Sequence, residues 1–314
     1  MSPDKDKLVI VSGPTAVGKT EISIKLAKKI NGEIISADSM QVYRGMDIGS
    51  AKVSQGEMDG VPHHLIDILD PKEDFNAALF KSYALRAMKG IYERGRIPII
   101  VGGTGFYIQG LLYDVDFSEQ AVDLEARARF TELLETKGAE YLYGILKEKD
   151  PEYAEITPMQ NSKRVIRALE FFSSTGRKIS DHNRREREKE SAYESYYFVL
   201  TLPRKVLYSR IEERVDKMIS DGLLSEVEKL RNSGCTKDMT SMQGLGYKQL
   251  FAYLDGRIGY EEAVDAIKKE TRHFAKRQMT WFRREKDVIF IDKSRYESDE
   301  EIISEIIERF EGKI

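Results

Sequence analysis

The sequence predicts an α/β protein in which a parallel sheet flanked by helices is interrupted by an inserted all-helical domain. Short β-branched runs alternate with helical patterns over the first hundred residues, which is typical of a parallel sheet covered by helices. A glycine-rich loop at 13–20 joins the first of these runs to a helical pattern. Strand patterns then disappear between about 114 and 195, before an apolar run returns at 196–202.

Length and composition indicate a globular protein. At 314 residues and 41% hydrophobic content, the chain is long enough for one large domain or about two. No stretch approaches the roughly 18 apolar residues of a membrane-spanning helix, and the charged start MSPDKDK has no signal-peptide pattern, so we expect a cytoplasmic protein without a membrane partner. The single cysteine, Cys235, excludes an internal disulfide framework.

The core elements are expected in a fixed order. Strands are predicted at 7–12, 33–37, 64–69, 97–101, 196–202 and 288–291. Helical spacing occupies 19–30 and 76–94, with Asp74 as a candidate cap for the second helix. Further helices are expected from Arg204 to about 284, and a last one at 298–311.

The middle of the chain predicts a separate domain. Amphipathic helices are expected at 122–148 and 160–174, and the charge run at 177–190 is predicted to be a mobile, solvated connection. We therefore expect a catalytic core made of 1–113 and 196–314, with a helical insertion at 114–195.

The loop at 13–20 predicts the ligand class. It matches G-x-x-x-x-G-K-[ST] between a strand and a helix, the context that supports a P-loop NTPase-like core. Backbone amides and the helix N-terminus are suited to phosphate oxygens, Lys19 adds a charge, and Thr20 offers a hydroxyl to Mg²⁺. The expected pyrophosphate-binding residues are Gly13, Pro14, Thr15, Ala16, Val17, Gly18, Lys19 and Thr20.

The loop alone leaves the reaction open. An ATP-driven motor should carry a carboxylate at the end of a second apolar strand, but the run at 97–101 continues into Gly102-Gly103-Thr104-Gly105. Small-molecule kinases often lack that carboxylate as well, so a kinase remains an alternative.

An acid follows the second predicted strand. The carboxyl ends of neighbouring parallel strands open onto one crevice, so Asp38 in Asp38-Ser39-Met40-Gln41 is expected to lie near the phosphate loop. It is a candidate general base, and capping of a turn is the other interpretation.

Eight segments, in this order, closely resemble the tRNA dimethylallyltransferases over about residues 7 to 291. They are GPTAVGKT, ADSMQVYRGMDIGSAK, PHHLID, IVGGTGFY, RVIRALE, RIEERVDKMISDGLLSEV, GLGYKQ and KRQMTWFR. The resemblance implies transfer of dimethylallyl from dimethylallyl pyrophosphate to N6 of the adenosine at tRNA position 37. It also implies release of pyrophosphate with the help of Mg²⁺.

The resemblance assigns catalytic roles to Asp38 as base, to Lys19, to Thr104 after the fourth strand, and to Arg214 as a pyrophosphate ligand. Arg210 lies four residues before Arg214 on the same helical face and is expected to pair with glutamates such as Glu213.

Two groups of residues are expected to contact the tRNA anticodon stem-loop. The segment 268–286 has eight Lys or Arg against two Glu, interleaved with aromatic residues, a composition suited to phosphates and unstacked bases. In the insertion, the family often has Gln-Arg-x-x-Arg, whereas this chain has Asn161 in place of the arginine after Gln160. The candidates are Asp38, Ser39, Met40, Gln41, Thr104, Arg127, Gln160, Lys163, Arg164, Lys276, Arg277, Gln278 and Arg283.

Other functions remain as alternatives: a P-loop kinase, a prenyltransferase acting on free adenine nucleotides, and a non-catalytic RNA-binding protein. The expected partners are tRNA and dimethylallyl pyrophosphate, and we expect a monomer with no obligate protein partner.

Overall fold

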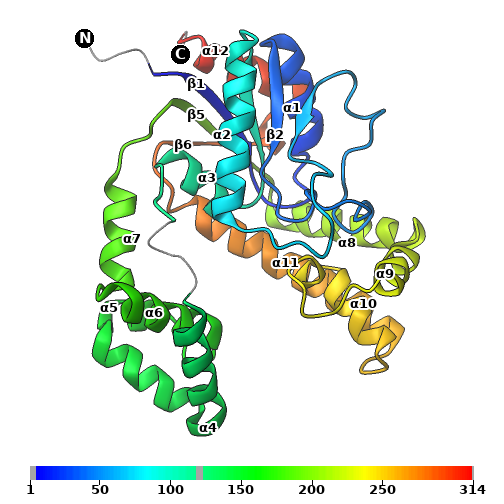
Figure 1. Cartoon of the computed structure of the whole chain (residues 1–314). Coiled ribbons are helices and arrows are strands. Elements are labelled where there is room, and N and C mark those ends of the chain that lie inside the picture. The colour runs from blue at the N-terminus through cyan, green and yellow to red at the C-terminus, as the bar shows by residue number, and fades with distance from the viewer. Residues whose placement is uncertain (1–4, 118–122, 313–314) are drawn as a thin grey trace. The chain divides into compact units, whose positions relative to one another are not determined.

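The computed structural model describes residues 5–117 and 123–312. The chain divides into two compact units, Met1–Leu111 with Tyr193–Ile314, and Leu112–Ala192. The division expected from the sequence places each boundary two or three residues further along the chain. Figure 1 shows the strands gathered in the first unit.

The first unit is built on a six-stranded parallel sheet with the strand order β3-β2-β4-β1-β5-β6. Central β1 pairs with β4 through Val9 and Ile99 and with β5 through Val11 and Phe198. The strands are β1 (Lys7–Ser12), β2 (Gly32–Ser36), β3 (His63–His64), β4 (Ile97–Gly102), β5 (Glu194–Thr201) and β6 (Val288–Asp292).

Helices cover both faces of this sheet. Val9 and Val11 of β1 belong to a core cluster with α1 and α12, whereas Leu8 and Ile10 are fully buried outside it, as expected for a strand covered on both faces. The helices of this unit are α1 (Lys19–Lys29), α2 (Ala77–Glu93), α3 (Gly105–Leu112), α8 (Arg204–Ser220), α9 (Leu223–Asn232), α10 (Tyr247–Leu254), α11 (Tyr260–Phe282) and α12 (Asp299–Phe310).

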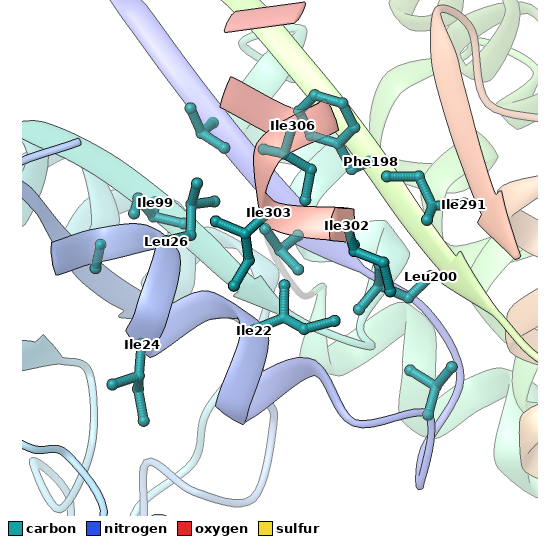
Figure 2. Close-up of a cluster of buried hydrophobic side chains, with 14 of the residues drawn as sticks. Ile22, Ile24, Leu26, Ile99, Phe198, Leu200, Ile291, Ile302, Ile303 and Ile306 are labelled. Atoms are coloured by element: carbon teal, nitrogen blue, oxygen red, sulfur yellow. The ribbon is translucent and has the colours of Figure 1, made fainter. Parts of the chain in front are cut away.

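The last helix completes the core. Ile302, Ile303 and Ile306 of α12 are buried, and Figure 2 shows Ile303 beside Ile22 and Leu26 of α1. Burial of a side chain of this size contributes about 1.5–3 kcal/mol, so α12 stabilises the face of the sheet that carries the phosphate loop's helix.

The second unit is helical within its described residues, with α4 (Leu124–Lys149), α5 (Pro151–Ile156), α6 (Ser162–Thr175) and α7 (Ile179–Glu188). Gly138 kinks α4 with a φ of 84°. A second core cluster that includes Phe130, Leu142 and Leu169 holds α4 and α6 together.

The charge run at 177–190 is not a mobile connection, so that expectation was wrong. It forms α7, and its inward side places Ile179, Ser180 and His182 in buried positions. Asp150 accepts hydrogen bonds from the Ser180 backbone N–H at 2.9 Å and from its hydroxyl at 2.6 Å. A helix that is otherwise highly charged therefore packs on its unit through inward residues that include these three.

Two local predictions in the core were also wrong. The strand expected at 64–69 is reduced to His63–His64 because Leu65 and Asp67 take left-handed backbone angles with φ of 63° and 56°. The cap of α2 is Asn76, which accepts from the Leu79 N–H, whereas Asp74 accepts from Thr240.

Candidate active site

The loop at 13–20 curls between β1 and α1. Gly13, Ala16 and Gly18 have φ of 141°, 64° and 91°, which bends the backbone around a small space. A Cβ on Gly13 would lie 2.5 Å from the carbonyl oxygen of Leu200, so only glycine fits there. α1 begins at Lys19 without a side-chain cap, which leaves N–H groups at its positive end for an anion.

Lys19 folds back over this loop. Its ammonium donates to the carbonyl oxygens of Gly13 at 3.0 Å and Pro14 at 2.9 Å. Burial, followed by the charge of Arg214, lowers the pKa of Lys19 to about 8, while Asp38 opposes the shift. The charged form is therefore short of negative partners, a condition that a bound polyphosphate would relieve.

The carboxyl ends of β1, β2 and β4 are tied together beside the loop. Ser12 Oγ donates to Gly102 O at 2.6 Å, the Ala37 N–H donates to Val101 O at 2.7 Å, and the Thr104 N–H donates to Ala37 O at 3.3 Å. These bonds bring Asp38 and Thr104 to the phosphate loop, since parallel strands all end at one edge.

Asp38 has a turn-forming role as well as its place in the site. Its Oδ1 accepts from the Met40 N–H at 2.8 Å and from the Gln41 N–H at 3.4 Å. The Gln41 side chain in turn accepts from Ser36 and donates to the Ser50 and Ala51 carbonyls. The turn-capping interpretation of Asp38 is therefore confirmed, and its role as a general base stays a prediction.

Two adjoining cavities meet at Asp38. The smaller, of about 130 Å³, is lined by phosphate-loop residues that include Lys19 and Thr20. The larger, of about 350 Å³, extends away from the loop, and Ser39, Met40 and Thr104 contribute to its lining. Residues that line both are Thr15, Asp38, Gly103, Arg214, Phe274 and Gln278.

The larger cavity has an apolar side that the sequence did not reveal. Its side chains come from α8, α11 and the segment before α10, and they are Ile211, Val215, Met218, Leu245 and Ile267. Four of them occupy ordinary amphipathic helix positions and Leu245 lies in the turn before α10, so spacing gave no signal that distinguishes these residues from other apolar residues.

Arg214 and Arg210 take different positions. Arg214 lines both cavities, and burial lowers its pKa while Asp38 raises it. Glu213 accepts from Ser209 at 2.8 Å, and Arg210 Nη1 lies 3.8 Å from where a Cβ on Gly18 would lie. The expected pairing of Arg210 with Glu213 was therefore wrong.

The basic segment of α11 is divided between two roles. Lys268 and Arg272 form ion pairs with Asp216 and Glu212 of α8. Lys276, Arg277 and Arg283 are exposed, and Arg277 also lies over the Phe274 ring and lines the larger cavity.

Gln278 and Trp281 point inward from α11. Gln278 is buried, accepts from the Thr15 N–H at 2.9 Å and donates to Gly103 O at 3.0 Å. Trp281 packs edge-to-face on Phe106, and its indole N–H has no hydrogen-bond partner among the described residues. Both side chains have structural contacts.

The insertion presents its candidates in two settings. Gln160 is exposed just before α6, and Lys163 and Arg164 are exposed in its first turn, where Asn161 accepts from the Arg164 N–H as the helix cap. Arg127 instead donates from Nε and Nη2 to buried Glu170, at 3.2 and 3.0 Å. Arg127 therefore joins α4 to α6.

The described residues contain no group of three or more His, Cys, Asp and Glu side chains suited to a metal ion. In the part of the chain that the structure describes, no helix is long and apolar enough to cross a membrane.

The chain resembles known proteins along its length. The IPP transferase family model matches residues 41–285, and the isopentenyl transferase model matches 6–69. A tRNA dimethylallyltransferase of Lachnoclostridium phytofermentans is 54% identical over 300 residues, which cover 96% of each chain.

Solved structures agree with these matches. The full-length tRNA isopentenylpyrophosphate transferase of Bacillus halodurans is 43% identical with a TM-score of 0.73, and covers 98% of both chains. The tRNA delta(2)-isopentenylpyrophosphate transferase of Staphylococcus epidermidis is 42% identical with a TM-score of 0.73, and the match covers 98% of this chain and 100% of that one. A eukaryotic dimethylallyltransferase acting on tRNA is 28% identical with a TM-score of 0.81, over 98% of this chain and 80% of its own. Because the family match extends over most of the sequence and these relatives align over nearly all of it, this chain belongs to the IPP transferase family, the tRNA dimethylallyltransferases.

Proposed function

We propose that this chain transfers a dimethylallyl group from dimethylallyl pyrophosphate to N6 of the adenosine at tRNA position 37 and releases pyrophosphate. The observation that carries the proposal is the position of Asp38 on the lining of both cavities. One cavity has the residues to hold a pyrophosphate, and the other has an apolar side suited to a short prenyl group. A kinase is not favoured, because the relatives named above are all transferases of a prenyl group to tRNA.

In this proposal, the phosphate loop holds the leaving group. As the bond between C1 of the prenyl group and the bridging oxygen breaks, the electron pair goes to the pyrophosphate, whose negative charge rises. Loop amides, Lys19 and Arg214 stabilise that charge, and they do so best where solvent is excluded. Lys19 is poised for this role because its ammonium is held over the loop before the ligand arrives.

Asp38 takes the proton from the attacking amine. The lone pair of N6 is delocalised into the adenine ring, so removal of the proton as the N6–C1 bond forms assists the attack. Thr104 lies on the lining of the larger cavity with Asp38 and is proposed to orient the base. The adenosine must leave its stack to reach them, which costs a few kcal/mol and least in a loop.

Mg²⁺ is proposed to be held by Thr20 together with pyrophosphate oxygens. The residues fit this arrangement, since Thr20 and Asp38 line the phosphate cavity and Mg²⁺ commonly binds through few protein oxygens, waters and substrate phosphates. When bound, the ion would neutralise charge on the leaving pyrophosphate.

The tRNA anticodon stem-loop is proposed to bind exposed basic residues. Lys276, Arg277 and Arg283 on α11 would contact phosphates or stack on unpaired bases. Gln160, Lys163 and Arg164 in the insertion would contact the same stem-loop, and the other tRNA-binding candidates stay predictions.

The test incubates the protein with radiolabelled dimethylallyl pyrophosphate, Mg²⁺ and unmodified tRNA, with AMP and ATP as alternative acceptors. Asp38→Asn retains an oxygen for the Met40 N–H but removes the base, so it should fold and lose activity by about 10²–10⁴-fold. Asp59→Asn, an exposed change outside the cavities, is the matched control. Label in AMP rather than tRNA would reassign the acceptor, and ATP consumption without transfer would overturn the proposal.

A further inference from the structure

A buried carboxylate behind the larger cavity accepts four hydrogen bonds. Glu226 of α9 receives the N–H groups of Asp47 and Ile48 on Oε2, at 2.9 and 2.8 Å. Its Oε1 receives the Gly49 N–H at 3.1 Å and the Tyr247 hydroxyl at 2.6 Å. Hydrogen bonds to an ionised acceptor are about twice as strong as neutral ones, so this cluster holds its partners firmly.

These bonds join two segments that are distant in sequence. Gly49 lies so close to Tyr247 that a Cβ there would be 2.5 Å from the tyrosine ring. Tyr247 is fully buried and begins α10 directly after Gly246. α9 and α10 are in contact, and Figure 1 shows them side by side.

Both segments form walls of the larger cavity. Gly49 and Ser50 contribute one part of its lining, and Gly244, Leu245 and Gly246 contribute another. Glu226 itself is outside that lining and reaches the walls only through backbone amides and Tyr247. The apolar side chains of α8 and α11 complete the cavity.

We infer that Glu226 is a positioning residue that fixes the width of the larger cavity and so limits the length of the prenyl group that this cavity accepts. The inference rests on the proposed function, because it takes the larger cavity to hold the prenyl tail. Without the carboxylate, three consecutive N–H groups lose their common acceptor, and the 47–49 backbone loses the hydrogen bonds that hold it beside Tyr247. A wider cavity would admit a ten-carbon chain that the native walls exclude.

The test compares two non-hydrolysable donors, the thiolodiphosphate analogues of dimethylallyl and geranyl pyrophosphate, whose Kd values are measured by calorimetry. The variants are Glu226→Gln and the matched Glu228→Gln, an exposed glutamate on the same helix. The preference for the shorter analogue is the Kd of the geranyl analogue divided by the Kd of the dimethylallyl analogue. We expect Glu226→Gln to lower this ratio by roughly tenfold or more, since even one methylene group in an apolar pocket is worth at least about tenfold in discrimination. Glu228→Gln should leave it within about twofold of the native value.

The ratio separates positioning from loss of structure. A smaller folded fraction reduces both apparent affinities together, so an unchanged ratio in Glu226→Gln would overturn the inference, as would a native protein that binds both analogues equally. Should Glu226→Gln fail to fold, Tyr247→Phe removes one of the four bonds and is expected to shift the ratio in the same direction; an unchanged ratio there would overturn it equally. Transfer of label to tRNA by the native protein is measured in parallel, so failure of the proposed function is seen independently of the binding ratio.

Discussion

The Gln278 side chain accepts a hydrogen bond from the backbone N–H of Thr15 at 2.9 Å, which links α11 to the phosphate loop across most of the sequence. The Nε2 group of the same side chain donates to Gly103 O at 3.0 Å. One buried side chain thus sets the spacing between the loop that would hold pyrophosphate and the turn that carries Thr104.

Gln278→Ala should weaken donor binding without preventing folding. It removes two hydrogen bonds worth about 1 kcal/mol each, and the phosphate loop loses its support, so we expect KM for dimethylallyl pyrophosphate to rise by about tenfold. Steady-state kinetics at saturating tRNA measures this. Thr280→Ala, an exposed change on the same helix, is the control, and an unchanged KM in Gln278→Ala would contradict the bracing role.

Pyrophosphate affinity should fall as the pH rises above about 8. The pKa of Lys19 is lowered to about 8 in the free protein, so above that pH Lys19 must take up a proton to meet the ligand as a cation. Affinity is therefore expected to fall by up to about tenfold per pH unit, with proton uptake visible by calorimetry in buffers of different ionisation enthalpy. Lys19→Gln should remove the part of the pH dependence that comes from Lys19. The part that comes from titration of the ligand itself is the same for both proteins. Equal pH dependence in the two would argue against a role for Lys19.

Glu33 should stabilise the core only where it is ionised. Its buried carboxylate accepts from Arg94, Arg96 and His64, and hydrogen bonding from Arg94 above all lowers its pKa to about 2. A lowered folded-state pKa gives stability that is present above the unfolded value of 4.5 and is lost as the pH falls toward about 2. Glu33→Gln is expected to lower the free energy of unfolding by about 2 kcal/mol at pH 7.

Urea unfolding at several pH values measures this difference, with exposed Glu93→Gln as the control. The difference in the free energy of unfolding between the native protein and Glu33→Gln should become smaller below pH 4.5. A gap that stays constant down to pH 3 would mean that packing rather than charge accounts for it.

Two sets of basic residues in the insertion should respond differently to alanine. Arg127→Ala removes a partner of buried Glu170 and should speed hydrogen exchange in α4 and α6 without tRNA present. Lys163→Ala and Arg164→Ala change exposed side chains, so hydrogen exchange should be unaffected while the affinity for tRNA falls. The slope of the logarithm of the binding constant against the logarithm of the salt concentration should decrease in magnitude by about 1 for each phosphate that is no longer neutralised. Filter binding over a salt series measures the slope. Unaltered exchange in Arg127→Ala would mean that the Glu170 pair does not hold the two helices.

Local sequence patterns were sufficient for the regular elements. The strand predicted at 7–12 is β1 residue for residue, and the helix predicted at 76–94 differs from α2 by one residue at each end. Apolar runs and helical spacing predict these elements because a helix or strand that buries one face needs apolar residues at regular intervals along the chain. The predictions at 64–69 and 177–190 failed where a few tertiary contacts or positive φ values outweighed composition.

The sequence by itself determined the family and the acid after the second strand, and it predicted the ligand class, because a phosphate loop and its neighbouring motifs are contiguous stretches that can be recognised one after another. Tertiary structure alone decided which apolar residues line the larger cavity, that Gln278 braces the phosphate loop, and that Glu226 holds the 47–49 backbone against Tyr247. These are contacts between residues far apart in the chain. A buried glutamine or glutamate looks like any other polar position until folding brings its partners within hydrogen-bonding distance.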